Sequence, residues 1–141
     1  MQSISNWFLR LAVLYLVAGV LLGIVMAASH DHQMHPVHAH LNLLGFVIMG
    51  MFGFFYRLWP EAAGARLAKV HFWAYVPAHF VQMAALFALY RGMTSIEPLL
   101  GLVSMIVGLA IVLFGYIVWK YTGEATPARE PAATVGGLAA R

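Results

Sequence analysis

The chain has 141 residues, of which 62% are hydrophobic and only 9% are charged, and its mean hydropathy is +0.82. A soluble domain of this length could not hide so much apolar surface from water, so the composition predicts an integral membrane protein. The formal net charge of +3 is carried by scattered basic residues and not by a basic face, so we expect no nucleic-acid partner. With no cysteine, the chain has no disulfide and no thiolate metal site.

Four apolar segments have the length of ~20 residues that a helix needs to cross a bilayer. They cover residues 11–28, 38–58, 70–90 and 99–119, and the connections between them are short. The sequence therefore predicts an all-α fold, an up-down-up-down four-helix bundle in contact with membrane lipid. We expect one transmembrane domain over residues 1–121, followed by a flexible tail over 122–141 that is rich in Ala, Gly, Thr and Pro.

Basic residues predict the orientation, because cytoplasmic loops of membrane proteins carry an excess of Lys and Arg. All but Arg91 fall on one side of the predicted bundle: Arg10, Arg57, Arg66, Lys69, Lys120, Arg129 and Arg141. We expect this side and both termini to be cytoplasmic, in a bacterial-type inner membrane. The alternative for the first span is a cleaved signal peptide, because small residues at 26–29 resemble a cleavage region.

Glycines predict where the helices meet, because small residues let membrane helices approach closely. Gly19 and Gly23 form a GxxxG pair in the first span, and further glycines occur in the second span at 45, 50 and 53. In the fourth span, glycines at 101, 108 and 115 recur every seven residues, which predicts a packing seam.

Two histidines at the start of the second span, His38 and His40, would lie at membrane depth, where polar groups are costly and indicate function. Residues two apart on a helix point about 200° apart, so these two predict two different sites. The His38 side continues through Asn42 and Gly45, as suits the bundle interior. The His40 side is apolar, and we expect His40 to be covered by haem or by a neighbouring protomer.

The third span carries a polar stripe made of His71, Tyr75, His79 and Gln82, which fall on one helical face. We expect this face to point into the bundle, with Pro77 able to kink the helix. Interhelical hydrogen bonds that only hold the bundle together are the alternative interpretation.

The connection between the first two spans combines His30, Asp31, His32 and His35 in six residues. Imidazole suits zinc and copper, and the nearby Met34 favours copper(I), so this loop predicts a transition-metal site on the extracytoplasmic side. A solvated loop that binds nothing is the alternative.

The stretch HAHLNLLGFVIMGMFGFFYRLWP, residues 38–60, resembles the haem-bearing helix of the catalytic subunit of haem–copper oxidases, especially the branch allied to nitric-oxide reductases. The shared pattern is H-x-H, a small-residue segment and a closing Leu-x-Pro. The resemblance implies that His38 binds a high-spin haem and His40 a low-spin haem. It covers one span of four, and the chain has no His-His pair for a copper centre.

We therefore expect a b-type haem held by His38 or His40, with His79, Met83 or a histidine of another subunit opposite. Such a haem would serve electron transfer to a redox partner or the binding of a gas. At ~1.5 Å per residue, His40 and His79 would differ by about 10 Å in height, which favours a homo-oligomer that supplies ligands from two chains. Binding of copper or zinc by the histidine loop is the alternative function.

Overall fold

A computed structural model describes residues 4–123, and these residues form helices and short turns without a strand. Four continuous helical segments are long and apolar enough to cross a membrane: Ile4–Ser29, His35–Leu58, Arg66–Tyr90 and Thr94–Thr122. The all-α fold with four spans is thus confirmed. The predicted tail lies outside the described residues except for its first two positions, of which Thr122 ends the last helix.

The spans are built from eight elements in chain order. These are α1 (Ile4–Ser29), α2 (His35–His40), the π-helix η1 (Leu41–Ile48), α3 (Met49–Leu58), α4 (Pro60–Gly64), α5 (Arg66–Tyr90), the 3₁₀ turn η2 (Thr94–Ile96) and α6 (Glu97–Thr122). The first span starts earlier than the hydropathy predicts, and α4 and η2 occupy stretches expected to be loops. At ~1.5 Å per residue, helices of this length extend beyond a ~30 Å hydrocarbon core, so their ends reach the headgroup region.

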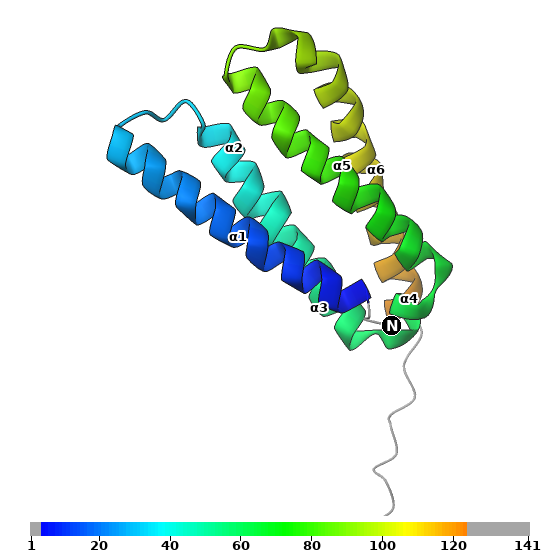
Figure 1. Ribbon diagram of the computed structural model, residues 1–141. Helices are drawn as coiled ribbons and strands as arrows, with labels where there is room; N and C mark the ends of the chain where they lie inside the picture. Colours follow the sequence, from blue (N-terminus) through cyan, green and yellow to red (C-terminus); the bar gives the residue numbers. More distant parts are fainter. Residues whose placement is uncertain (1–3, 124–141) are drawn as a thin grey trace, which may run out of the picture.

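Two helical hairpins make up the bundle. In one, α1 packs along η1 and α3; in the other, α5 packs along α6, and most contacts between helices lie within each hairpin. Figure 1 shows the hairpins converging at the end that carries α4 and diverging toward the end that carries the α1–α2 and α5–α6 connections. We call these the α4 end and the loop end. The start of α1 and the end of α6 both lie at the α4 end (Figure 1).

The first hairpin is held by the glycines that the sequence singles out. A Cβ atom added to Gly19, Gly23, Gly45 or Gly53 would come within 2.6–2.8 Å of a side chain on the opposing helix. Ser5, which is 1% exposed, donates a hydrogen bond of 2.9 Å to the Gly53 carbonyl in the same interface. These glycines therefore set how closely α1 approaches the second span.

The prediction that glycines of the fourth span form a helix-packing seam is wrong within the part of the chain that the structure describes. A Cβ atom on Gly101, Gly108 or Gly115 would meet nothing within 4 Å among the described residues. The second hairpin instead buries the side chains of Val103, Val107, Ala110 and Ile117. Val103, Ala110 and Ile117 lie nearly opposite the glycines on the helix, because a separation of two residues corresponds to about 200°.

Candidate functional site

His38 and His40 occupy opposite sides of α2, as their spacing predicts. The His38 ring packs against α1, where its Nδ1 atom lies 2.9 Å from the Gly19 carbonyl oxygen. The His40 Nδ1 atom lies 2.8 Å from the carbonyl oxygen of Pro36 in its own helix. A carbonyl oxygen only accepts, so in both residues Nδ1 carries the proton and Nε2 keeps its lone pair.

The π-helix η1 begins directly after His40 and was not foreseen from the sequence. Its wider turn changes the helical phase that a uniform 3.6-residue period assumes, and π-helical turns frequently occur at functional sites. The Asn42 side chain donates a hydrogen bond of 2.8 Å to the His38 carbonyl at the junction. The backbone therefore changes from α-helical to π-helical directly after the two histidines that the sequence predicts as ligands.

The polar stripe of α5 points into the bundle. His71, Tyr75 and His79 are 0% exposed and Gln82 is 6% exposed. The Tyr75 hydroxyl donates a hydrogen bond of 3.0 Å to the Leu44 carbonyl, which fixes the register of α5 against η1. This stripe therefore connects the two hairpins.

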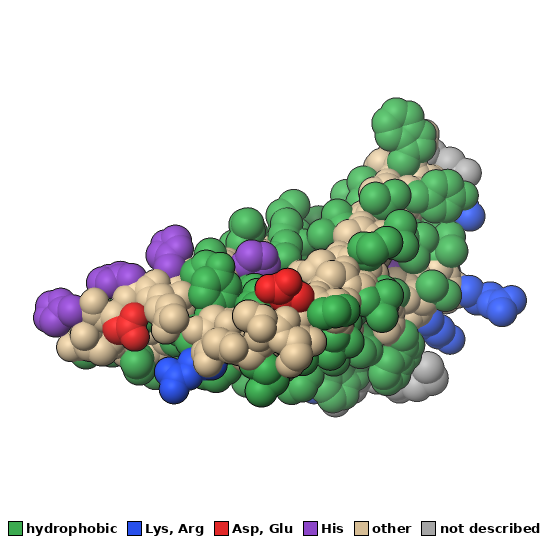
Figure 2. Space-filling view, turned by 90° about the horizontal axis from the view of Figure 1, so that it is seen from above, with side chains coloured by type: hydrophobic (Ala, Val, Ile, Leu, Met, Phe, Trp, Pro, Cys, Tyr) green, Lys and Arg blue, Asp and Glu red, His purple; other side chains and the backbone are tan. Residues whose placement is uncertain are grey.

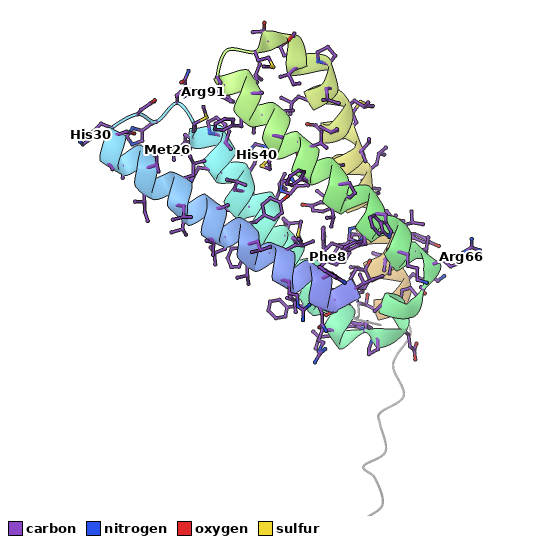
Figure 3. The ribbon with its side chains drawn as sticks, viewed as in Figure 1. Phe8, Met26, His30, His40, Arg66 and Arg91 are labelled. Atoms are coloured by element: carbon purple, nitrogen blue, oxygen red, sulfur yellow. The ribbon has the colours of Figure 1, made fainter. Side chains whose placement is uncertain are left out.

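This register places His40 and His79 opposite each other. The second and third spans run in opposite directions, and the hydrogen bond joins Tyr75 to Leu44 at one height. His40 lies four residues before Leu44 and His79 lies four residues after Tyr75, so each is about one helical turn nearer the loop end. Their imidazoles are close enough to interact electrostatically. Figure 3 shows His40 on the side of α2 that faces α5. The register set by this hydrogen bond predicts similar heights for the two histidines, whereas residue counts from the helix ends, which ignore the register and the π-helix, predict a difference of about 10 Å.

His79 has one free nitrogen in a buried setting. Its Nδ1 atom lies 3.1 Å from the Gln82 side-chain oxygen, and the Gln82 amide in turn donates to the Ser104 hydroxyl at 2.9 Å. Among the described residues, the Nε2 atom of His79 has no hydrogen-bond partner although it is fully buried. A buried nitrogen without a partner is costly, and coordination would offset this cost.

A cavity of about 580 Å³ lies between the hairpins, lined by residues of α1, η1 and α5: Leu11, Leu14, Tyr15, Ala18, Leu41, Val76, Pro77, Phe80, Met83 and Ala84. Its volume falls in the range of roughly 300–1,000 Å³ that is usual for ligand sites. Tyr15 links the cavity to His79, because the centroids of these two rings are 4.9 Å apart. Of these residues, the sequence analysis named Met83 as a possible haem ligand and Pro77 as a possible kink.

The histidine loop does not assemble a metal site among residues 4–123. No group of three or more His, Asp or Glu side chains there is placed to hold an ion. The Asp31 carboxylate accepts a hydrogen bond of 2.9 Å from the Gln33 backbone N–H. His30, the first residue after α1, has a left-handed backbone conformation with a φ of 55°. The view onto the loop end shows histidine side chains spread along the surface (Figure 2). Copper or zinc binding by His30, Asp31, His32 and His35 stays a prediction.

Comparison with known proteins agrees with the resemblance of the second span at a coarse level. The chain is 26% identical to a putative cytochrome c oxidase subunit 1-beta of Streptomyces avermitilis and 27% identical to one of Streptomyces coelicolor, with 81% of the chain and 24% of each relative covered. It is 26% identical to a probable cytochrome c oxidase subunit 1-alpha of Streptomyces avermitilis, with 72% of the chain and 22% of the relative covered. No protein-family model and no solved structure matches the chain. The chain thus spans about a quarter of the length of these relatives, and it is a multi-pass membrane protein distantly similar to cytochrome c oxidase subunit 1.

Proposed function

We propose that this protein binds a b-type haem between its two hairpins, that His40 and His79 would hold it, and that it serves electron transfer or the binding of a gas. The observation that carries this proposal is the pair His40 and His79, in which each Nδ1 has a hydrogen-bond partner and the buried Nε2 of His79 has none among residues 4–123. This is how ligand histidines are usually prepared, because a hydrogen bond at one nitrogen fixes the tautomer and orients the other.

Two features beside His79 support the proposal, although neither His40 nor His79 is among the residues that line the cavity. The buried Nε2 atom of His79 has no hydrogen-bond partner among the described residues, and an apolar cavity lies beside Tyr15, which contacts the His79 ring. A haem held by both histidines would supply one-electron exchange, whereas a haem held by His79 alone would leave a position for a diatomic gas. The chain would supply His40 and His79 as ligands, and the Pro36 carbonyl and the Gln82 side chain would orient their rings. The apolar surroundings would exclude water. Met83, which is 7% exposed and one turn beyond His79, is the alternative ligand on α5.

His38 stands apart from this pair. The resemblance assigns it a high-spin haem, but its ring packs on α1, where a Cβ atom on Gly23 would come within 2.8 Å of it. We propose that His38 has a structural role, in which its hydrogen bond to the Gly19 carbonyl holds α1 against the second span. Binding of a haem by His38 is the alternative. We also propose that the chain resembles the nitric-oxide-reductase branch more than other haem–copper oxidases. Only the sequence pattern of residues 38–60 supports this finer assignment.

Titration of the purified protein with haemin tests the proposal. We expect a saturable Soret band with one haem per chain, and a reduced spectrum typical of a six-coordinate b-type haem. A colourless protein that carries stoichiometric copper or zinc would contradict the proposal and favour the histidine loop as the functional site.

Gln82 is expected to tune this site without touching the haem. Gln82→Leu keeps the side-chain volume but removes the acceptor at His79 Nδ1, and loss of such a partner usually weakens ligation about 10–100-fold. Haemin titration should show this loss with little change in helix content by circular dichroism. Ser104→Ala should weaken haem binding less than Gln82→Leu, because Gln82 could still accept the hydrogen bond from His79. An equal loss of affinity in Ser104→Ala would contradict the direct role of Gln82 at His79.

We also propose that the α4 end is cytoplasmic and the histidine loop extracytoplasmic, because basic residues concentrate toward the α4 end. Since the chain lacks cysteine, His32→Cys and Gly64→Cys each introduce a single exposed thiol, one at either end. A membrane-impermeant maleimide added to intact cells should label the former and not the latter. The reverse pattern would invert the topology.

A homo-oligomer remains a proposal. If His40 and His79 of one chain hold the haem, a second copy would not be needed to complete the pair and would serve to cover apolar surface. Size measurement of the detergent-solubilised protein, corrected for detergent, tests this directly. A strictly monomeric protein would exclude it.

A further inference from the structure

We propose that Arg10 and Arg57 bind the headgroup of an anionic phospholipid, with one acyl chain of the same lipid lying in a groove along α1. The site is on the outer surface of α1, near the α4 end of the bundle. It does not include His40 or His79, so the inference does not depend on the proposed haem.

The two arginines come from different spans and meet beside Asn6. Arg57, next to the last residue of α3, donates a hydrogen bond of 3.4 Å from its Nη1 atom to the Asn6 side-chain oxygen. Arg10 follows Asn6 by four residues on α1, so these two side chains lie on the same helical face, about one turn apart. Both arginines are exposed. Two guanidinium groups therefore serve one patch of the surface.

Close packing between α1 and α3 fixes where Arg57 lies. A Cβ atom added to Gly53, one helical turn before Arg57, would come within 2.7 Å of the Leu9 side chain. The Ser5 hydroxyl donates a hydrogen bond of 2.9 Å to the Gly53 carbonyl in the same interface. The Arg57 side chain thus extends from a rigid junction of two helices, where a binding group is positioned more accurately than on a loop.

A shallow groove of about 460 Å³ begins at Arg10 on the outer face of α1, and it is lined by Leu9, Arg10, Val13 and Leu14. Farther along the helix, the same face continues with exposed apolar side chains: Val17, Leu21 and Ile24. One leaflet is half of the ~30 Å hydrocarbon core, which equals about ten residues of helix. The face that starts at Arg10 is therefore long enough for one acyl chain, with the lipid headgroup at Arg10.

The position of Arg10 along α1 suits a contact with lipid phosphate. At ~1.5 Å per residue, the 26 residues of α1 exceed a ~30 Å hydrocarbon core by about 9 Å, and Arg10 lies about 9 Å from Ile4. An arginine so close to the edge of the core extends its side chain toward the headgroups. Its guanidinium carbon lies 6.0 Å from the centre of the Trp7 ring, and tryptophan favours the same interface.

Charge and shape at this site favour an anionic phospholipid over other ligands. Guanidinium groups bind phosphate through paired hydrogen bonds. Among residues 4–123, the α4 end has Glu61 as its one acidic residue and five basic residues: Arg10, Arg57, Arg66, Lys69 and Lys120. This positive charge repels the ammonium group of a zwitterionic headgroup. Free phosphate would gain nothing from the apolar groove, so the groove and the arginines together fit a lipid.

Native mass spectrometry of the purified protein in detergent tests the site, because it counts bound lipids and yields their affinities. We expect one tightly bound phosphatidylglycerol per chain and weaker binding of phosphatidylethanolamine with the same acyl chains. Arg10→Gln and Arg57→Gln should each lower the affinity for phosphatidylglycerol about fivefold, which is the usual contribution of one basic side chain near anionic lipid. Arg66→Gln is the matched control. It removes the same charge from the far side of the α4 end (Figure 3) and should change the affinity less than about twofold.

Val13→Trp fills the groove and keeps both arginines, so we expect it to weaken the binding of phosphatidylglycerol as well. All the substituted side chains are exposed, and helix content by circular dichroism should stay that of the wild type. Equal binding of the two lipids would overturn the inference. An equal loss of affinity in Arg66→Gln would also overturn it, because diffuse charge would then explain the binding. Displacement of the lipid by inorganic phosphate would do the same, because the acyl chain would then contribute nothing.

Discussion

Replacing His79 with alanine is expected to abolish stoichiometric haem binding. His79 is 0% exposed and supplies a free Nε2 atom beside His40, and no other described histidine on α5 approaches that level, since His71 lies two turns nearer the α4 end. Loss of an axial ligand should remove the six-coordinate spectrum and weaken binding by at least about 100-fold. Haemin titration followed at the Soret band measures both effects.

His32→Ala is the matched control for this loss, because His32 is exposed in the loop and is not one of the proposed haem ligands. It should bind haem as the wild type does. His40→Ala should behave like His79→Ala. If His79→Ala kept a wild-type spectrum while His38→Ala lost it, the assignment taken from the family resemblance would replace ours.

Gly45→Ala is expected to have the largest effect on stability. An added Cβ atom would lie 2.6–2.8 Å from the Tyr15 atoms Cβ, Cγ and Cδ1, and Tyr15 cannot avoid it by moving only the end of its side chain. Overpacking of this kind costs about 1–3 kcal/mol, more than the gain of ~0.5–1 kcal/mol from replacing glycine with alanine in a helix. Thermal unfolding in detergent should therefore show a lowered midpoint.

Two other glycines serve as controls for this effect. The nearest atom to an added Cβ atom is 3.9 Å away at Gly50 and beyond 4 Å at Gly108. Gly50→Ala and Gly108→Ala should be neutral or slightly stabilising, because only the helix propensity changes. Equal destabilisation by all three substitutions would contradict the close approach of α1 to the second span.

Hydropathy and helical periodicity predict much of this fold because each describes a physical requirement that membrane burial imposes. Four apolar stretches must be helices in lipid, and the stripe from His71 to Gln82 must face inward. The GxxxG pair in α1 follows from the need for close backbone approach. Each of these features depends on residues within one segment, which is why sequence alone reveals them.

Features that depend on pairs of segments could not be predicted in this way. The register between η1 and α5 depends on the Tyr75 hydrogen bond to Leu44, which counting residues from the helix ends cannot take into account. The heptad of glycines in α6 has the spacing of a seam, yet the face that packs on α5 is decided by Val103 and Val107 on the other side. The π-helix likewise has no periodic signal in its eight residues.

Low-temperature electron paramagnetic resonance of the oxidised, haem-loaded protein identifies which side chains ligate ferric haem. With His40 and His79 as the ligands, we expect a low-spin signal of two imidazoles that is lost in both His40→Ala and His79→Ala. A high-spin signal in the wild type, or a low-spin signal that survives both substitutions, would contradict this assignment.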